Sequence, residues 1–189
     1  CTLISATAAV ITQIPASVMD AGYATTTAAS IASLYLFIAI PGKLVLGHIY
    51  DRYGVKSGIL FGNTMFFLSV VCLIFIKHQP FLYLMAILFG FGTCIGTVSA
   101  PVITSGIFGT KHYAEIYGFL SLFPSVGYAL GGPLIASAYD LTGSYNIAWI
   151  IVAVLSIVMT AFLLYSYRVS RVCIKEQEKT ADKAKNTMK

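Results

Sequence analysis

The chain has 189 residues, of which 58% are hydrophobic, 13% aromatic and only 10% charged. A soluble domain carries about 25% charged residues, so this composition excludes an ordinary soluble enzyme. Ten of the 19 charged residues (12 basic and 7 acidic) lie between Arg168 and Lys189. The first 167 residues are therefore nearly free of charge, and their length fits six membrane-spanning helices of about 20 residues each.

Apolar runs between charged residues and Pro/Gly breaks predict the six spans in chain order. We place them at residues 1–18, 25–49, 58–77, 80–107, 114–138 and 147–167. Residues 168–189 form a basic, polar tail that we expect to be disordered. The chain begins inside an apolar run without an initiator methionine, so we expect it to be a fragment. Buried helices of a soluble core are the alternative interpretation, which the charge distribution disfavours.

The connections between the spans alternate in charge. The connections after the first, third and fifth spans contain a single Lys or Arg residue, Lys77. The connections after the second and fourth spans, together with the tail, contain ten. Loops rich in Lys and Arg stay in the cytoplasm, so residues 50–57, residues 108–113 and the C-terminal tail are predicted to be cytoplasmic. This predicts a multi-pass protein of the bacterial inner membrane or the plasma membrane. Membrane lipids account for the net charge of +5, and nucleic acid is not an expected partner.

Proline and glycine recur inside the predicted spans. The prolines are Pro41, Pro101, Pro124 and Pro133, and the glycines include Gly90, Gly92, Gly96, Gly127, Gly131 and Gly132. Proline removes a backbone donor and bends a helix, whereas glycine lets a neighbouring helix approach closely. These residues could therefore serve close packing or form hinges, and the sequence leaves both roles open.

A short motif, Y-D-x-x-G, occurs twice. It begins at Tyr50 after the second span and at Tyr139 after the fifth span. Three spans separate the two copies, so they lie on opposite faces of the membrane. This placement is typical of a three-plus-three inverted repeat, as in each six-helix half of one large transporter class. Coincidence is the alternative, because Asp and Gly are common at helix ends.

The stretch from Gly47 to Lys56, G-H-I-Y-D-R-Y-G-V-K, resembles the G-x-x-x-D-R-x-G-x-[RK] signature of the major facilitator superfamily. Gly131-Gly132-Pro133 with the following Y-D-L-T-G is similar to the end of helix 11 in the monocarboxylate and oxalate/formate porter branches. Gly42-Lys43 also resembles the Gly-Arg step of the oxalate/formate branch. The resemblance implies an all-α membrane protein, with the six spans as helices 7–12 of a twelve-helix fold and the N-terminal half missing.

The resemblance implies that the signature loop latches the cytoplasmic side against the missing half. The latch residues would be Gly47, Asp51, Arg52, Gly54, Lys56 and Glu115. Asp51 can face the positive N-terminus of a neighbouring helix, and Gly54 permits a tight turn. Glu115 suits the N-terminus of the fifth span. A loop that only fixes topology through its positive charge is the alternative.

The candidate substrate-binding residues are polar groups at middle depth in the spans. They are Gln13, Tyr35, Lys43, Thr97, Ser125 and Tyr128. Lys43 is the ionisable residue deepest in a span, which marks a functional site by default, although its side chain could instead reach the interface. A basic residue would attract an anion, but the fifth span lacks the Lys or Arg of the oxalate/formate branch. Each Ser or Thr could instead bond its own helix backbone.

No enzyme motif, nucleotide-binding loop or metal-ligand cluster stands out, so neither a cofactor nor a metal is expected. The sequence therefore predicts a secondary transporter of a small organic solute, most simply an anion such as a monocarboxylate. It would work by alternating access with proton symport or exchange. A non-transporting membrane protein, such as a sensor or a channel-like bundle, is the alternative.

Overall fold

The structure is a computed structural model that describes residues 10–108 and 113–187. Over these residues every regular element is a helix. The helices are α2 (Val10–Asp20), α3 (Thr25–Ile74), α4 (Gln79–Gly92), α5 (Cys94–Phe108), α6 (Tyr113–Leu120), α7 (Leu122–Thr142) and α8 (Tyr145–Thr187). The predicted all-α class is confirmed. Residues 1–9 of the first predicted span and Lys111 in the predicted cytoplasmic loop lie outside the described residues.

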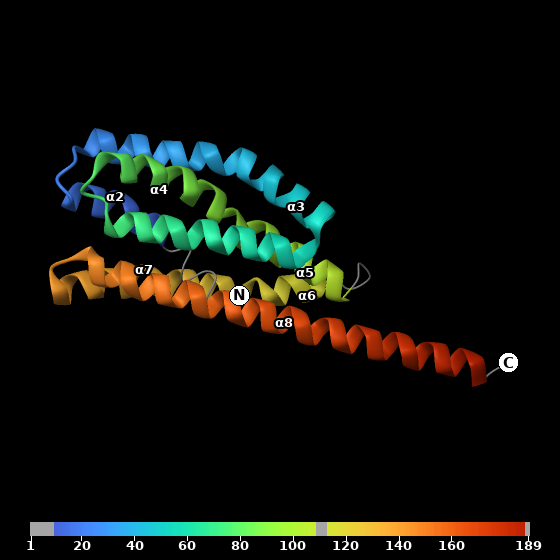
Figure 1. Cartoon of the computed structure of the whole chain (residues 1–189). Coiled ribbons are helices and arrows are strands. Elements are labelled where there is room, and N and C mark those ends of the chain that lie inside the picture. The colour runs from blue at the N-terminus through green and yellow to red at the C-terminus, as the bar shows by residue number, and fades with distance from the viewer. Residues whose placement is uncertain (1–9, 109–112, 188–189) are drawn as a thin grey trace.

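The α3 helix consists of two arms that run in opposite directions (Figure 1). The reversal is at Gly54, whose backbone angles, φ 82° and ψ 169°, are not helical. We call residues 25–53 the first arm and residues 55–74 the second arm. The bundle then consists of α2, the two arms, α4 with α5, α6 with α7, and α8. We call its two ends the Gly54 end and the Gly143 end, after the turns located there.

Four helical stretches are long and apolar enough to cross a membrane. They are Thr25–Ile74, Gln79–Ser99, Tyr113–Leu141 and Tyr145–Ser166, with hydropathies of 1.9, 2.0, 1.4 and 2.8. The first has 50 residues, more than twice the roughly 20 that one crossing needs, so each of its arms can cross separately.

The fourth and fifth predicted spans are each divided. The fourth breaks at Thr93, between α4 and α5, and the fifth breaks at Ser121, between α6 and α7. Pro124 explains the second break, because proline cannot donate the backbone hydrogen bond that would continue the helix through Leu120. At this break the Ser121 hydroxyl donates to the Gly118 carbonyl oxygen at 2.7 Å.

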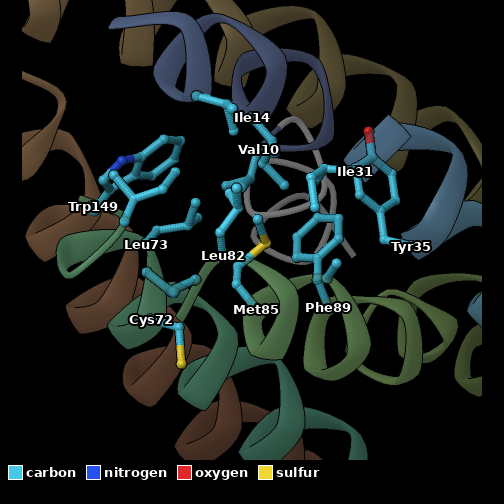
Figure 2. Packing of buried hydrophobic residues seen from close by; sticks show 14 of the residues in the cluster. Val10, Ile14, Ile31, Tyr35, Cys72, Leu73, Leu82, Met85, Phe89 and Trp149 are labelled. Carbon is cyan, nitrogen blue, oxygen red and sulfur yellow. The ribbon is translucent and has the colours of Figure 1, made fainter. Parts of the chain in front are cut away.

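The main core lies where both arms of α3, α2, α4 and α8 meet (Figure 2). Its largest fully buried side chains include Trp149, Phe89, Ile14, Leu73 and Met85. Figure 2 shows Phe89 and Met85 of α4 beneath Ile14 of α2, with Trp149 of α8 beside Leu73. These residues are far apart in sequence, so the cluster joins the two halves of the proposed repeat.

Glycines of α4 permit close helix packing. A Cβ atom on Gly90 would lie 2.7 Å from Ile38 Cγ2 and 2.9 Å from the Tyr35 carbonyl oxygen. A Cβ atom on Gly92 would lie 2.6 Å from the Cα and N atoms of Phe66. For these two glycines the structure supports the packing role, because the helices could not approach this closely around a side chain.

The α8 backbone continues as helix through the polar segment 168–187 and extends beyond the rest of the bundle (Figure 1). We expected this tail to be disordered. Its composition offers a physical reason for the difference, because it is rich in Lys and also contains Arg, Glu and Ala, which all favour helix. A preceding helix also removes the cost of nucleation.

Gly54 and Gly143 both have positive φ, but their conformations predict that they tolerate substitution to different degrees. Gly54, at φ 82° and ψ 169°, lies in a region that only glycine adopts readily. Gly143, at φ 66° and ψ 14°, is left-handed helical, which asparagine also tolerates. We expect Gly54→Asn to lower the free energy of unfolding by about 1–3 kcal/mol and Gly143→Asn to lower it by clearly less. Denaturant titration of the full-length protein measures both values, and equal losses would contradict this account.

Candidate functional site

Polar side chains meet at middle depth between α2, the first arm of α3 and α7. Tyr35 of the first arm is 3% exposed, and its hydroxyl donates to the Ile11 carbonyl oxygen of α2 at 3.4 Å. Its ring packs edge-on against Phe89, with centroids 5.2 Å apart (Figure 2). Tyr128 of α7 is 44% exposed and close enough to interact electrostatically with Tyr35. The structure therefore brings two of the candidate substrate-binding residues together.

Gln13 is half-buried on α2, two residues after the carbonyl group that Tyr35 contacts. The residue before it on α2 lies near α7, because Thr12 Oγ1 is 3.9 Å from the position of a Cβ atom on Gly132. Gln13 thus lies on a helix that packs against both the first arm and α7. Its binding role stays a prediction.

Thr97 and Ser125 are exposed, and both bond their own helices. The Thr97 hydroxyl donates to the Cys94 carbonyl oxygen at 3.2 Å, and the Ser125 hydroxyl donates to the Ser121 carbonyl oxygen at 3.2 Å. This is the alternative that the sequence left open for single Ser and Thr residues. Each hydroxyl still has acceptor capacity for a ligand.

Lys43 is exposed on the first arm and lies two turns beyond Tyr35, about 12 Å along the helix axis. It is close enough to Cys94, at the start of α5, to interact with it electrostatically. Its neighbours Ile40 and Leu44 are 63% and 74% exposed, so this surface is not covered by other described helices. Lys43 is therefore separate from the Tyr35–Tyr128 pair, beside the break at Thr93.

The signature residues lie at the Gly54 end, at the turn between the arms of α3. Asp51 and Arg52 are exposed, and the Arg52 guanidinium lies over the Tyr53 ring, 5.9 Å from its centroid. Gly54 makes the turn that the sequence predicted for it. Gly47 is half-buried and Lys56 is exposed. The loop thus presents acidic and basic groups outward, and the latch role of these residues stays a prediction.

Glu115 is in the first turn of α6 and is exposed. A carboxylate in this position interacts favourably with the positive end of the helix dipole. The helix-terminal placement is as expected from the sequence. The proposed contact between Glu115 and the missing half stays a prediction.

Sequence reasoning missed the contacts of the two repeated tyrosines. Tyr50 is 6% exposed and shares a hydrogen bond with Ser99 of α5. The Tyr139 hydroxyl donates to Asp20 Oδ1 at 2.7 Å, and the Tyr139 ring stacks on Tyr145 with centroids 4.3 Å apart. The Y-D-x-x-G motif was the available signal, because it places a tyrosine one turn before each glycine turn.

The apolar helices and their antiparallel passes define a multi-pass helical membrane protein, with a charged loop at one end of the bundle. The chain belongs to the Major Facilitator Superfamily, whose family model matches residues 1–189. The resemblance inferred from the Gly47–Lys56 signature is thereby confirmed.

Several curated proteins are similar to this chain. Monocarboxylate transporter 14 of Mus musculus is 28% identical over 136 residues, covering 71% of this chain and 26% of that protein. Monocarboxylate transporter 9 of Pongo abelii is 32% identical over 110 residues, covering 57% of this chain and 21% of that protein. Monocarboxylate transporter 12 of Homo sapiens is 25% identical over 158 residues, covering 82% of this chain and 31% of that protein. The chain thus spans between a fifth and a third of the length of these relatives. No solved structure matches it.

Proposed function

We propose that this chain forms the C-terminal six-helix half of a secondary transporter. The transporter would move a small organic anion, such as a monocarboxylate, by alternating access. The observation that carries the proposal is the complete signature at the Gly54 turn of a bundle belonging to this superfamily. The relatives named as monocarboxylate transporters support the choice of substrate class.

The site would be shared with the N-terminal half of the same protein. Tyr35, Tyr128 and Gln13 would form the polar part of this half at middle depth. The Tyr128 hydroxyl and the Gln13 amide can donate to a carboxylate, whereas the Tyr35 hydroxyl would first have to release the Ile11 carbonyl oxygen. Lys43 would supply a positive charge on an uncovered surface of the first arm. Since no acidic group lies deep in the predicted spans, proton symport would need a carrier in the other half, and exchange is equally compatible with the residues present.

The Gly54 end would face the cytoplasm, because the Lys and Arg residues of the loops gather there and in the tail. The signature loop would then hold the cytoplasmic ends of the two halves together in one conformation. The protein would reside in the plasma membrane or the bacterial inner membrane, in contact with lipid and without enzymatic activity.

The substrate class is tested by uptake into proteoliposomes that contain the full-length protein. Labelled L-lactate, formate, oxalate and glucose are compared at equal concentration. We expect lactate or formate to accumulate fastest, with oxalate slower because α6 and α7 supply no basic side chain. A pH gradient, alkaline inside, accelerates uptake if protons are co-transported and leaves it unchanged if the protein exchanges anions. Faster uptake of glucose than of any anion would contradict the anion assignment.

A further inference from the structure

The two copies of Y-D-x-x-G make matching contacts at opposite ends of the bundle. Tyr50, directly after the second span on the same helix, bonds Ser99 in the fourth. Tyr139, directly after the fifth span on the same helix, bonds Asp20 at the end of the helix of the first. In a three-plus-three repeat the second span corresponds to the fifth and the first to the fourth. Each tyrosine therefore bonds the first helix of the other repeat, so the two hydrogen bonds join two pairs of helices that are equivalent by the repeat symmetry.

The glycine of each motif supports this equivalence. Gly54 and Gly143 both have positive φ, at 82° and 66°, and each lies four residues after its tyrosine. Each glycine ends its helix and lets the next helix return alongside. Tyr50 then meets the start of the second arm, and Tyr139 meets the start of α8, where its ring stacks on Tyr145.

The surroundings of the two hydrogen bonds are different. Tyr50 is 6% exposed and Ser99 is fully buried, and a Cβ atom on Gly58 would lie 2.4–2.8 Å from the Tyr50 ring. Breaking the Tyr50–Ser99 bond would leave two buried hydroxyls without partners, which is unfavourable. The Tyr139–Asp20 bond is exposed, so water can take the place of either partner when the helices separate.

We propose that the Tyr139–Asp20 bond opens and closes during the transport cycle, whereas the Tyr50–Ser99 bond keeps its two helices in contact throughout. The Gly143 ends of the first and fifth spans would part, and the Gly54 ends of the second and fourth spans would stay together. The inference thus rests on the proposed alternating-access function and adds a specific opening between two helices of this half.

The test measures distances between spin labels on the full-length protein in lipid nanodiscs. One label pair replaces Met19 and Leu141, which are 43% and 87% exposed near the Asp20–Tyr139 contact. The second pair replaces Tyr53 and Ser105, both exposed near the Gly54 end. We expect the first pair to show a short and a long distance, and the second pair to show one.

Tyr139→Phe removes the hydroxyl and keeps the stacked ring. We expect it to raise the ratio of long to short distances for the Met19/Leu141 pair by about two- to tenfold, the change in equilibrium expected when one exposed hydrogen bond is lost. Asp20→Ala removes the other partner of the same hydrogen bond and should raise the same ratio. Because Asp20 is exposed, this variant keeps the test valid if the tyrosine variant folds poorly. Tyr145→Phe, the matched control on the neighbouring ring, should leave the ratio unchanged.

The proposal is overturned if Tyr139→Phe and Tyr145→Phe give the same distances, or if the Tyr53/Ser105 pair separates as much as the Met19/Leu141 pair. Lactate uptake by the same preparations separates this failure from failure of the proposed function. Uptake without a change in distances rejects the opening alone. A change in distances without uptake of any anion rejects the substrate class and leaves the opening in place.

Discussion

Gly92→Ala is expected to lower the free energy of unfolding by about 3 kcal/mol, at the upper end of the usual cost of overpacking. The added Cβ atom would lie 2.6 Å from the Cα and N atoms of Phe66. The contact is with backbone, so no side-chain rotation can relieve it, and α4 must move away from the second arm of α3. That movement would also disturb Phe66 and Phe89, whose rings lie 5.9 Å apart in the core.

The matched control, Gly118→Ala, is expected to change the free energy of unfolding in the opposite direction. Gly118 lies in α6, and a Cβ atom there would meet nothing within 4 Å. Alanine is preferred over glycine in a helix by about 1 kcal/mol, so Gly118→Ala should raise stability slightly. Fluorescence-detected size-exclusion chromatography after heating compares the two full-length variants. If Gly92→Ala were as heat-resistant as Gly118→Ala, the close approach of α4 to the second arm would be wrong.

Lys43→Gln is expected to have the largest effect on transport. If Lys43 binds a carboxylate, the lost interaction with a charged group corresponds to about 1.5–3 kcal/mol, or roughly a ten- to hundredfold rise in the KM for lactate. Lys43→Arg should retain most of the affinity because the charge remains. The effect should fall mainly on KM, because the residue acts on substrate binding.

Lys77→Gln provides the control for Lys43, because Lys77 is an exposed residue in the turn after the second arm, at the Gly143 end. Its substitution removes the same charge without touching the first arm. Initial rates of labelled lactate uptake in proteoliposomes measure both variants. Equal KM values for Lys43→Gln, Lys77→Gln and the unmodified protein would assign Lys43 to the membrane interface instead of the substrate site.

Much of the fold could be predicted because each span depends on local composition. The apolar runs indicated where the helices lie, and the turn predicted at Gly54 is formed. The helix breaks at Thr93 and Ser121 were not predicted, since an apolar run shows no change of composition there. The helical tail was also missed, because high charge alone does not distinguish a disordered segment from a helix continued from a stable one.

The site was less predictable, because it depends on contacts between distant residues. Tyr35 was identified as polar and central, but its bond to the Ile11 carbonyl requires the packing of α2 on the first arm. The partners of Tyr50 and Tyr139 lie 49 and 119 residues away in sequence. The sequence alone also could not show that Thr97 and Ser125 bond their own helices, since the same residues could equally face a ligand.

Counterflow tests the central claim most directly, because it requires a binding site that faces the two sides of a membrane in turn. Proteoliposomes with the full-length protein are loaded with unlabelled L-lactate and diluted into a trace of labelled lactate, without ATP or an ion gradient. The account predicts that labelled lactate rises transiently above its equilibrium level inside the vesicles. A monotonic approach to equilibrium would indicate a channel-like bundle, and no entry of lactate or of any other organic anion would contradict the transporter assignment.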